Sequence, residues 1–236
     1  MASVVIKNWD NKTWLSSQKY INSFNRFLIK NFNLNSNSKI LDIGCGRGKI
    51  LGALNSKLKF KIKPLGIDII EHRNRDKRIN FKRIDALNYS STDNQKFDLI
   101  LIKQTIHLMK LNEIKKMLYL LKKKLSPNGK IFIFTLDARK NEIPTFKKMN
   151  YGLDKSLKRD MRILKIITKL YPKRIKKKFV YNVKIKKKKY LEMIKNRYIS
   201  TLIPLSKKQL VLGIQEINSK YKNILRFKDK LICIIL

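Results

Sequence analysis

Cysteine is scarce in this sequence of 236 residues. The two cysteines, Cys45 and Cys233, form neither a disulfide framework nor a metal-binding spacing, so we expect no metal site and a reducing, cytoplasmic setting. The main apolar stretches, Leu99–Ile102 and Leu231–Leu236, are too short to cross a bilayer. Met1–Asn8 also lacks the apolar segment of a signal peptide. These absences indicate a soluble protein.

Acidic residues are few as well. The chain has 16 Asp and Glu against 56 Lys and Arg, which gives a formal net charge of +40. Such a charge attracts nucleic acid, anionic membrane surfaces and acidic proteins. No base-reading module or aromatic-interleaved basic motif accompanies the charge, and the abundance of Lys, Asn and Ile fits compositional drift. Nucleic acid and an anionic membrane therefore stay open as partners on charge alone, and neither is favoured.

The remaining composition is that of a globular protein. Hydrophobic residues make up 43% of the chain and aromatic residues 9%, which argues against disorder. A chain of this length fits one domain, or a domain with a subdomain, and can bury a sizeable core.

Glycines at alternate positions follow an apolar stretch that carries a carboxylate. Lys39–Ile43 has the pattern of a strand with Asp42 inside it, and apolar residues at helical spacing resume from Ile50. The glycines between them are Gly44, Gly46 and Gly48. Glycine allows a tight turn and lets a ligand approach the main chain, and the helix N-terminus that follows suits an anionic group. The stretch predicts a strand, a turn and a helix around a ligand.

This acid and glycine pattern differs from the Gly-x-Gly-x-x-Gly of dinucleotide-binding folds. It resembles the first motif of the class I methyltransferases, which use S-adenosylmethionine and release S-adenosylhomocysteine. The resemblance implies that Asp42 and the turn bind this cofactor. The turn residues concerned are Gly44, Cys45, Gly46 and Gly48. The alternative is a glycine-rich turn in another kind of α/β protein.

Two further strands end in acids. Lys63–Ile69 contains Asp68, about 20 residues beyond the turn, the spacing of a carboxylate that binds ribose hydroxyls, and Ile69 lies beside it. Ile79–Ala86 contains Asp85. In the resembled family an acid at this place accepts a hydrogen bond from the adenine amino group, and the backbone N–H of the next residue, here Ala86, faces the ring.

The fourth strand, Phe97–Ile102, is nearly all apolar, as a buried parallel strand should be. Lys103 follows it, and we expect only its backbone to contact the cofactor, because its ammonium would repel a sulfonium. Gln104 borders the same pocket. His107 stands where the family often has a histidine, and imidazole is the side chain that titrates nearest to neutral pH, so it is the candidate catalytic base. The alternative is that His107 is a structural member of the turn.

The rest of the chain continues the alternation of helices and strands. We expect a helix over Leu111–Leu125, a turn over Ser126–Gly129 and a fifth strand over Lys130–Leu136, followed by helices over residues 153–171, 190–203 and 206–217 and strands over residues 179–185 and 231–236. Together these predict an α/β fold with a doubly wound, mostly parallel seven-stranded sheet, helices on both faces and a helical cap over the acceptor site. We expect a lid helix in residues 1–38, a cofactor-binding core in 39–137 and an acceptor segment in 138–236.

Aromatic residues near the N-terminus and one C-terminal segment are the candidate acceptor contacts. Apolar spacing predicts an amphipathic helix from about Thr13 to Phe32, and in the resembled families such a segment closes the site. The candidates are Trp9, Trp14, Tyr20, Gln104, Arg197 and Tyr198. The alternatives are core aromatics and a surface helix with a buried tyrosine.

The resemblance implies a methyltransferase, with a small molecule methylated at O, N or S as the favoured acceptor. The Asp/Asn-Pro-Pro-aromatic run of base-amino methyltransferases and the Pro-Cys pair of cytosine C5 chemistry are absent, and Lys103 replaces the acid of RNA ribose methyltransferases. Two alternatives remain: an RNA or protein methyltransferase that docks its substrate through the basic surface, and a non-catalytic interaction module. The intact set of glycines and acids argues against the second.

Overall fold

The computed structural model describes residues 13–92, 94–139 and 141–236, so Trp9 lies outside the described residues. The chain divides into two compact units. The core unit contains residues 21–135, 162–179 and 231–236, and the second unit contains residues 1–20, 136–161 and 180–230. The expected division at residues 38 and 137 stays a prediction.

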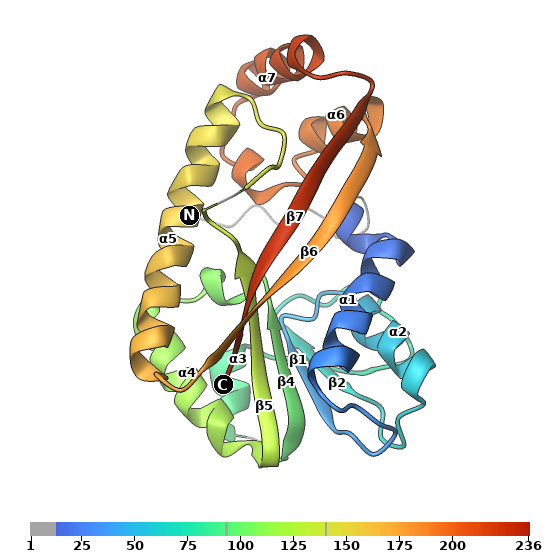
Figure 1. The fold of residues 1–236 in the computed structure, drawn as a ribbon, viewed down its shortest axis with the longest axis vertical. Coiled ribbons are helices and arrows are strands. Elements are labelled where there is room, and N and C mark those ends of the chain that lie inside the picture. The colour runs from blue at the N-terminus through green and yellow to red at the C-terminus, as the bar shows by residue number, and fades with distance from the viewer. Residues whose placement is uncertain (1–12, 93, 140) are drawn as a thin grey trace. The chain divides into compact units, whose positions relative to one another are not determined.

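Seven strands of the described chain form one sheet in the order β3-β2-β1-β4-β5-β7-β6 (Figure 1). Their bounds are β1 Ile40–Ile43, β2 Leu65–Asp68, β3 Asn80–Arg83, β4 Phe97–Lys103, β5 Leu125–Leu136, β6 Ile175–Lys186 and β7 Ile224–Ile235. β1 pairs in parallel with β2 and β4, and β2–β3 and β4–β5 are also parallel. Ile131 and Leu236 exchange two backbone hydrogen bonds, the pattern of an antiparallel pair. The predicted α/β class with a mostly parallel seven-stranded sheet is confirmed.

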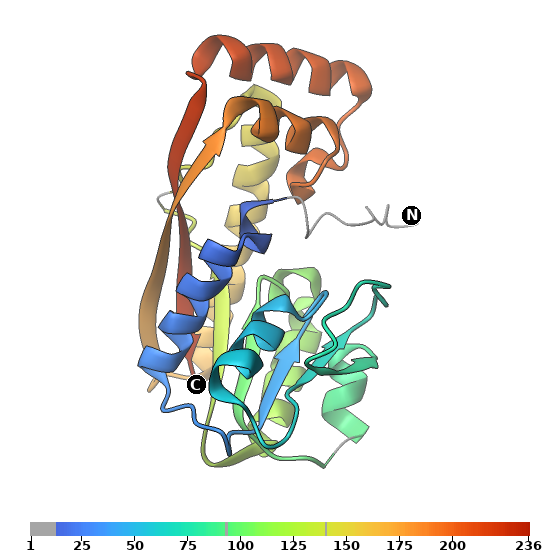
Figure 2. The same cartoon turned by 90° about the vertical axis from the view of Figure 1, so that its right-hand side faces the viewer.

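Helices cover both faces of the sheet within the core unit. Alternate strand residues point to opposite faces, so the apolar side chains of one strand pack against helices on both sides. Leu41 and Ile43 belong to a buried cluster with residues of α4 (Leu111–Lys123) and of α5 (Lys147–Leu170). On the opposite face, Phe134 packs edge-on against Phe24 of α1 (Gln18–Asn31), with ring centroids 4.7 Å apart. Figures 1 and 2 show α1 and α2 (Lys49–Leu58) on one side of the sheet and α4 on the other. The sheet is therefore buried on both sides, which explains the apolar sequence of β4.

The first helix begins later than the spacing predicts. Trp14–Ser16 form a short 3-10 helix, and α1 starts at Gln18 rather than at Thr13. The hydroxyl of Ser17 accepts a hydrogen bond from the backbone N–H of Tyr20 at 3.2 Å, as an N-cap side chain does. Local capping therefore sets this boundary, because apolar spacing alone cannot separate a helix from the turn before it.

The expected turn at Ser126–Gly129 lies inside β5. Phe97 pairs with Leu125 but Leu99 pairs with Lys130, so the residues between bulge out of the ladder. A Cβ on Gly129 would lie 2.7 Å from the carbonyl oxygen of Phe97, which explains the glycine at this bulge. The predicted separate turn is therefore wrong: Ser126–Gly129 form a bulged part of β5, because pairing with β4 already begins before them.

The second unit has its own core, in which Tyr190 is fully buried with Met193, Leu210 and Phe227. Its helices include α6 (Lys187–Lys195) and α7 (Lys207–Lys220), and a 3-10 turn covers Ser200–Leu202. The expected continuous helix over residues 190–203 is wrong. No helix in the described part of the chain is both long enough and apolar enough to span a membrane.

Helix α6 ends in a Schellman motif, in which the N–H of Tyr198 bonds to the carbonyl of Met193 at 2.9 Å and that of Arg197 to Ile194 at 3.0 Å. Arg197 takes the left-handed conformation, with φ of 56°, which is unusual for a residue with a Cβ. The apolar periodicity of the sequence continues past this point and hides the end of the helix.

Candidate active site

The glycine turn connects β1 to α2 and is fastened to the neighbouring strand. The backbone N–H groups of Gly44 and Cys45 both donate to the carbonyl of Ile67 in β2, at 2.9 and 3.1 Å. The N–H of Gly48 donates to the carbonyl of Cys45 at 2.9 Å, and α2 begins at the next residue. Burial raises the pKa of the Cys45 thiol, so Cys45 contributes its backbone here and not a thiolate.

All three glycines of the turn have positive φ, between 55° and 70°, where other residues are strained. A Cβ on Gly44 would lie 2.2 Å from Oγ1 of Thr105, and one on Gly48 would lie 2.1 Å from Cδ1 of Ile79. The sequence argument attributed the glycines to the backbone angles of a tight turn and to the approach of a ligand, and the positive φ values agree with the first reason. Atoms of the protein itself impose the requirement at these two positions.

Asp68 is joined to the glycine turn. Its Oδ2 accepts a hydrogen bond from the backbone N–H of Gly46 at 2.8 Å, and its Oδ1 accepts one from Ile70 at 3.0 Å. Each carboxylate oxygen has a second lone pair that can accept a hydrogen bond from a hydroxyl group. The next residue, Ile69, is 62% exposed. The carboxyl end of β2 thus presents a fixed carboxylate and an open apolar side chain beside the turn.

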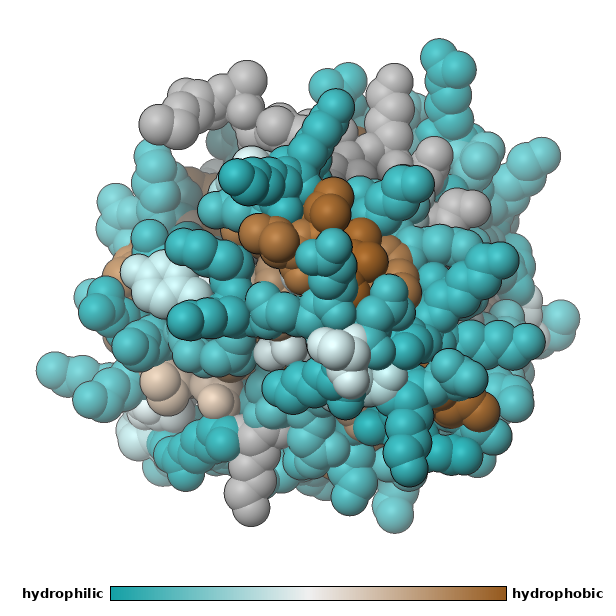
Figure 3. Space-filling view, turned by 90° about the horizontal axis from the view of Figure 1, so that it is seen from above, coloured by the Kyte–Doolittle hydropathy of each residue, from teal (hydrophilic) through white to brown (hydrophobic). Residues whose placement is uncertain are grey.

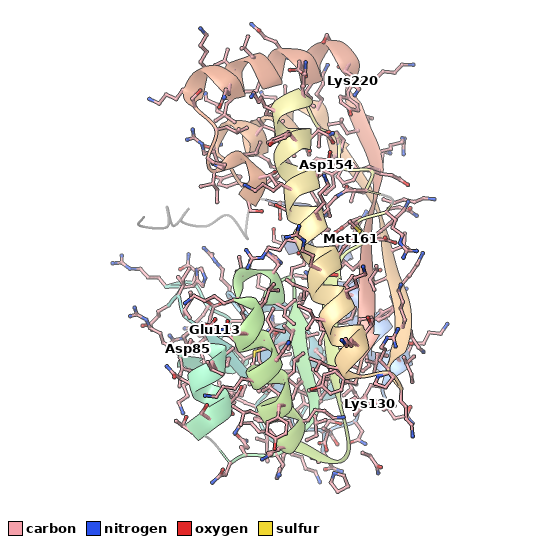
Figure 4. The ribbon with its side chains drawn as sticks, turned by 90° about the vertical axis from the view of Figure 1, so that its left-hand side faces the viewer. Asp85, Glu113, Lys130, Asp154, Met161 and Lys220 are labelled. Atoms are coloured by element: carbon pink, nitrogen blue, oxygen red, sulfur yellow. The ribbon has the colours of Figure 1, made fainter. Side chains whose placement is uncertain are left out.

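Asp85 occupies the N-cap position of α3 (Ala86–Thr92), where Figure 4 labels it at the end of the helix. Its Oδ1 accepts backbone N–H bonds from Leu87 at 3.0 Å and Asn88 at 2.9 Å, and its Oδ2 accepts a bond from the Asn88 side chain. The N–H of Ile84 donates to the carbonyl of Asp68 at 3.0 Å, which ties this strand end to β2. Sequence reasoning missed the capping role, although an acid one residue before a helix is a known signal for it.

Asp42 is a buried carboxyl on the α1 face of β1. It pairs with Leu101 of β4, and Leu101 points to the same face of the sheet as Lys103, two residues later. Burial raises the pKa of Asp42 to about 8; the positive charge of Lys103 opposes this shift and the negative charge of Asp68 adds to it. A carboxyl in this state is largely neutral at pH 7. A cation bound beside it would favour its ionised form.

We expect replacement of Asp42 by asparagine to remove a pH dependence of stability. The folded pKa of about 8 exceeds the ordinary value of 3.8, so the folded state retains a proton that the unfolded state releases. The contribution of Asp42 to the free energy of unfolding is therefore largest below about pH 4 and falls as the pH rises toward 8. Urea unfolding of the cofactor-free protein at pH 5, 6.5, 8 and 9.5 measures this effect. As the pH rises, the free energy of unfolding of wild type should fall relative to that of Asp42→Asn.

Asp160 supplies the control for this experiment. Burial raises its pKa to about 6, against the opposing charge of Arg159, so Asp160→Asn should change the pH dependence below about pH 6 only. Parallel stability profiles of wild type and Asp42→Asn between pH 6.5 and 8 would show that Asp42 is ionised in the folded protein.

The end of β4 brings three polar residues together. Nζ of Lys103 donates to Oε1 of Gln104 at 3.0 Å and lies 5.4 Å from the ring centroid of Phe24. Gln104 has φ of 53°, and its N–H donates to the carbonyl of Phe134 at 2.9 Å. Oγ1 of Thr105 bonds to the carbonyl of Lys103 at 3.1 Å and reaches that of Gly44 at 3.5 Å. Thr105, which sequence reasoning missed, thus links the end of β4 to the glycine turn.

His107 is half-buried in the short 3-10 helix Ile106–Leu108, directly after these residues. The structure thus places it at the carboxyl end of β4, as the sequence predicts. Its role as a base stays a prediction.

Trp14 and Tyr20 lie in the second unit and both interact with the buried carboxylate of Asp229. Nε1 of Trp14 donates to Oδ2 of Asp229 at 3.0 Å. Tyr20 is fully buried and packs edge-on against Tyr181, and burial together with the charge of Asp229 raises the pKa of its phenol. Sequence reasoning missed Asp229, because no local signal relates it to residues 215 positions earlier.

Arg197 and Tyr198 also lie in the second unit. Nη2 of Arg197 donates to the carbonyl of Leu205 between α6 and α7. Arg197 lines a groove of about 1040 Å³ between these helices, named here the α6–α7 groove. Tyr198 lines a smaller cavity of about 500 Å³ beside α6. The predicted cofactor residues, with Gln104 and His107, belong to the core unit, and the other described acceptor candidates belong to the second unit.

Comparison with known proteins identifies the family. The family model described as a methyltransferase domain matches residues 34–228. No curated protein sequence matches the chain significantly.

Solved structures share the fold at low sequence identity. A methyltransferase from an antibiotic biosynthesis pathway of Anabaena variabilis, described as putative, is 15% identical over 89% of this chain and 95% of its own, with a TM-score of 0.61. The plantazolicin methyltransferase BpumL, bound to a monoazolic desmethylPZN analog and S-adenosylhomocysteine, is 19% identical over 97% and 87%, with a TM-score of 0.53. A methyltransferase of Thiobacillus denitrificans bound to S-adenosylhomocysteine is 14% identical over 93% and 91%, with a TM-score of 0.53. The chain belongs to the methyltransferase domain family and is a class I, S-adenosylmethionine-dependent methyltransferase.

Proposed function

We propose that this methyltransferase moves the methyl group of S-adenosylmethionine to an O, N or S atom of a small-molecule acceptor. The observation that carries the proposal is the attachment of Asp68 to the glycine turn, which fixes a carboxylate beside a backbone loop at the carboxyl ends of β1 and β2. In open α/β sheets, ligands bind at the carboxyl edge near the point where the strand order reverses, which here lies between β1 and β4. Similarity to a putative methyltransferase of an antibiotic biosynthesis pathway and to the plantazolicin methyltransferase supports a natural-product type of acceptor.

The residues of the core unit fit the chemical groups of the cofactor. Asp68 has lone pairs left for the two ribose hydroxyls, and Asp85, although it caps α3, has acceptor capacity left for an amino group. Ala86 would face the adenine ring through its backbone N–H, and Ile69 would cover an apolar face of the nucleoside. Asp42 would respond to a bound cation by releasing its proton.

The end of β4 completes the proposed cofactor site. Because Nζ of Lys103 is directed to Gln104 and Phe24, only the backbone of Lys103 is left to contact the cofactor. The turn residues Gly44, Cys45, Gly46 and Gly48 contribute main-chain groups. The bound cofactor supplies a methyl group already activated on a sulfonium, so the protein chiefly positions the acceptor and accepts its proton.

The acceptor contacts stay proposals. Gln104 and His107 border the cofactor residues in sequence and lie at the carboxyl end of β4. Trp14 and Tyr20 are tied together through Asp229, so Tyr20 would serve the acceptor only through a buried network. Trp9, Arg197 and Tyr198 complete the proposed set.

Calorimetric titration tests the cofactor part of this proposal. The purified chain, freed of carried-over cofactor, is titrated with S-adenosylmethionine and with S-adenosylhomocysteine, and we expect micromolar dissociation constants for both. Pools of small metabolites are then screened for acceptor-dependent formation of S-adenosylhomocysteine. Turnover that persists at high salt supports a small molecule, whereas methylation of RNA that is lost steeply between low and moderate salt would favour a nucleic-acid acceptor.

Replacement of His107 tests its role as a base. We expect His107→Ala to lower turnover by about 10²-fold or more, the usual contribution of a general base, and to change the affinity for S-adenosylhomocysteine less than twofold. His107→Gln keeps a polar side chain of similar reach but cannot act as a base. Recovery of turnover by glutamine would assign His107 a structural role.

A further inference from the structure

The α6–α7 groove lies within the second unit and has an aliphatic floor. Helices α6 and α7 run antiparallel: Nζ of Lys187, at the start of α6, donates to the carbonyl of Asn218 in the last turn of α7 and to that of Tyr221 just after it. At the other end, Arg197 after α6 donates to Leu205 before α7. The floor between these ends consists of Leu191, Leu210, Val211, Ile214 and Ile224.

Two apolar side chains of the groove floor are exposed. Val211 is 56% exposed and Ile224 is 46% exposed. Figure 3 shows a central apolar patch surrounded by hydrophilic side chains, with smaller apolar areas elsewhere on the same face. A contiguous apolar surface with a polar rim is typical of an interaction site.

Positive charge lies at both ends of the groove. Lys186 and Lys188 lie at the start of α6, and Lys195, Arg197 and Lys207 lie at the opposite end. Glu192 is the one acidic residue among the described residues that line the groove. The charge pattern is therefore positive, apolar and positive along the groove.

We propose that the α6–α7 groove binds an acidic amphipathic helix of a partner protein. An amphipathic helix lays its apolar face in a groove through side chains at i, i+3, i+4 and i+7, and acidic residues near both of its ends would meet the lysines. Helix α7, with 14 residues, is about 21 Å long at a rise of about 1.5 Å per residue, so it matches a partner helix of about four turns.

Other occupants fit the groove less well. A single-headed anionic amphiphile would satisfy the positive charge at one end only. Single-stranded nucleic acid relies on aromatic side chains for base stacking, and the floor is entirely aliphatic. A second copy of this chain carries a net charge of +40 and the same cationic rim, which opposes its docking here.

The test uses synthetic peptides and the full chain. The probe is a fluorescent 15-residue peptide with leucines at helical spacing on one face and glutamates in its first and last turns. One matched peptide replaces the leucines by serine and another replaces the glutamates by lysine. Fluorescence anisotropy should show binding of the probe at least tenfold tighter than of either matched peptide.

Adjacent residues of α7 provide matched variants. Val211 lines the groove, whereas Leu212, 52% exposed, does not. We expect Val211→Glu to weaken binding at least tenfold and Leu212→Glu to change it less than twofold. Lys207→Glu should likewise weaken binding more than Lys208→Glu, because only Lys207 lines the groove. Unchanged affinity of all four variants for S-adenosylhomocysteine and unchanged melting temperatures verify that they are folded.

Several results would overturn the proposal. These are no binding of the acidic amphipathic probe, equal binding of the serine peptide, and equal loss in Val211→Glu and Leu212→Glu. The proposal would also be overturned if Val211→Glu bound single-stranded RNA or vesicles of anionic phospholipid more weakly than Leu212→Glu did, while both variants bound the peptide equally. Because the peptide assay needs no methyl transfer, its outcome is separate from that of the proposed function.

Discussion

Replacement of Gly44 by alanine should destabilise the protein by about 2 to 5 kcal/mol and abolish measurable binding of S-adenosylhomocysteine. Gly44 has φ of 70°, where a Cβ costs about 1 to 2 kcal/mol. The new Cβ would also lie 2.2 Å from Oγ1 and 2.3 Å from Cγ2 of Thr105, and overpacking of this kind costs about 1 to 3 kcal/mol. Urea unfolding and calorimetric titration measure the two effects.

The control for this prediction is Gly152→Ala, in the interior of α5. The nearest atom to a Cβ there, the carbonyl oxygen of Thr201, lies at 3.5 Å, an ordinary contact. Alanine should therefore stabilise this helix by about 0.5 to 1 kcal/mol. A Thr105→Gly change in the Gly44→Ala background removes the steric conflict but not the strain in φ, so it should restore part of the loss. If the double variant is no more stable than additivity of the single changes predicts, contact with Thr105 does not account for the glycine.

Replacement of Asp68 by alanine should weaken binding of S-adenosylhomocysteine by more than about tenfold, because the two hydrogen bonds that we propose it makes to ribose hydroxyls would be lost. The change also removes the acceptor for the N–H of Gly46, so part of the loss would come from the glycine turn itself. Asp68→Asn retains one oxygen for that N–H and loses the charge. We expect its affinity to lie between those of wild type and Asp68→Ala.

A ligand that lacks one ribose hydroxyl separates these two causes. Wild type should bind 2′-deoxy-S-adenosylhomocysteine more weakly than S-adenosylhomocysteine, whereas Asp68→Ala should bind the two ligands nearly equally. A variant that still discriminates between the ligands as wild type does would show that Asp68 does not bind the ribose. A small loss of affinity with no change in discrimination would leave Asp68 the role of holding Gly46.

Much of the core unit could be predicted from the sequence, because its signals are local. The strands β1, β2 and β4 are apolar runs bounded by breakers, and the turn after β1 needs glycine at fixed positions. Parallel strands place their carboxyl ends at one edge of the sheet, so Asp42, Asp68 and the residues after β4 had to lie along that edge. Chain order and strand direction alone lead to this result.

Features that depend on long-range contacts were not predictable in the same way. Thr105 explains the glycine at Gly44, but the two residues are 61 positions apart. The end of α6 at Arg197 depends on a left-handed residue that is not glycine, and no residue preference signals it. The capping role of Asp85 was within reach of a sequence argument, because its signal is local.

The sequence by itself determined the family, the sheet and the set of acids and glycines at its edge, since each is encoded by neighbouring residues with a fixed period or spacing. Only the tertiary structure decided the protonation of Asp42, the burial of Tyr20 against Asp229 and the cationic ends of the α6–α7 groove. These depend on which distant side chains surround a group. Burial and electrostatic potential are set by that packing, and sequence spacing does not record it.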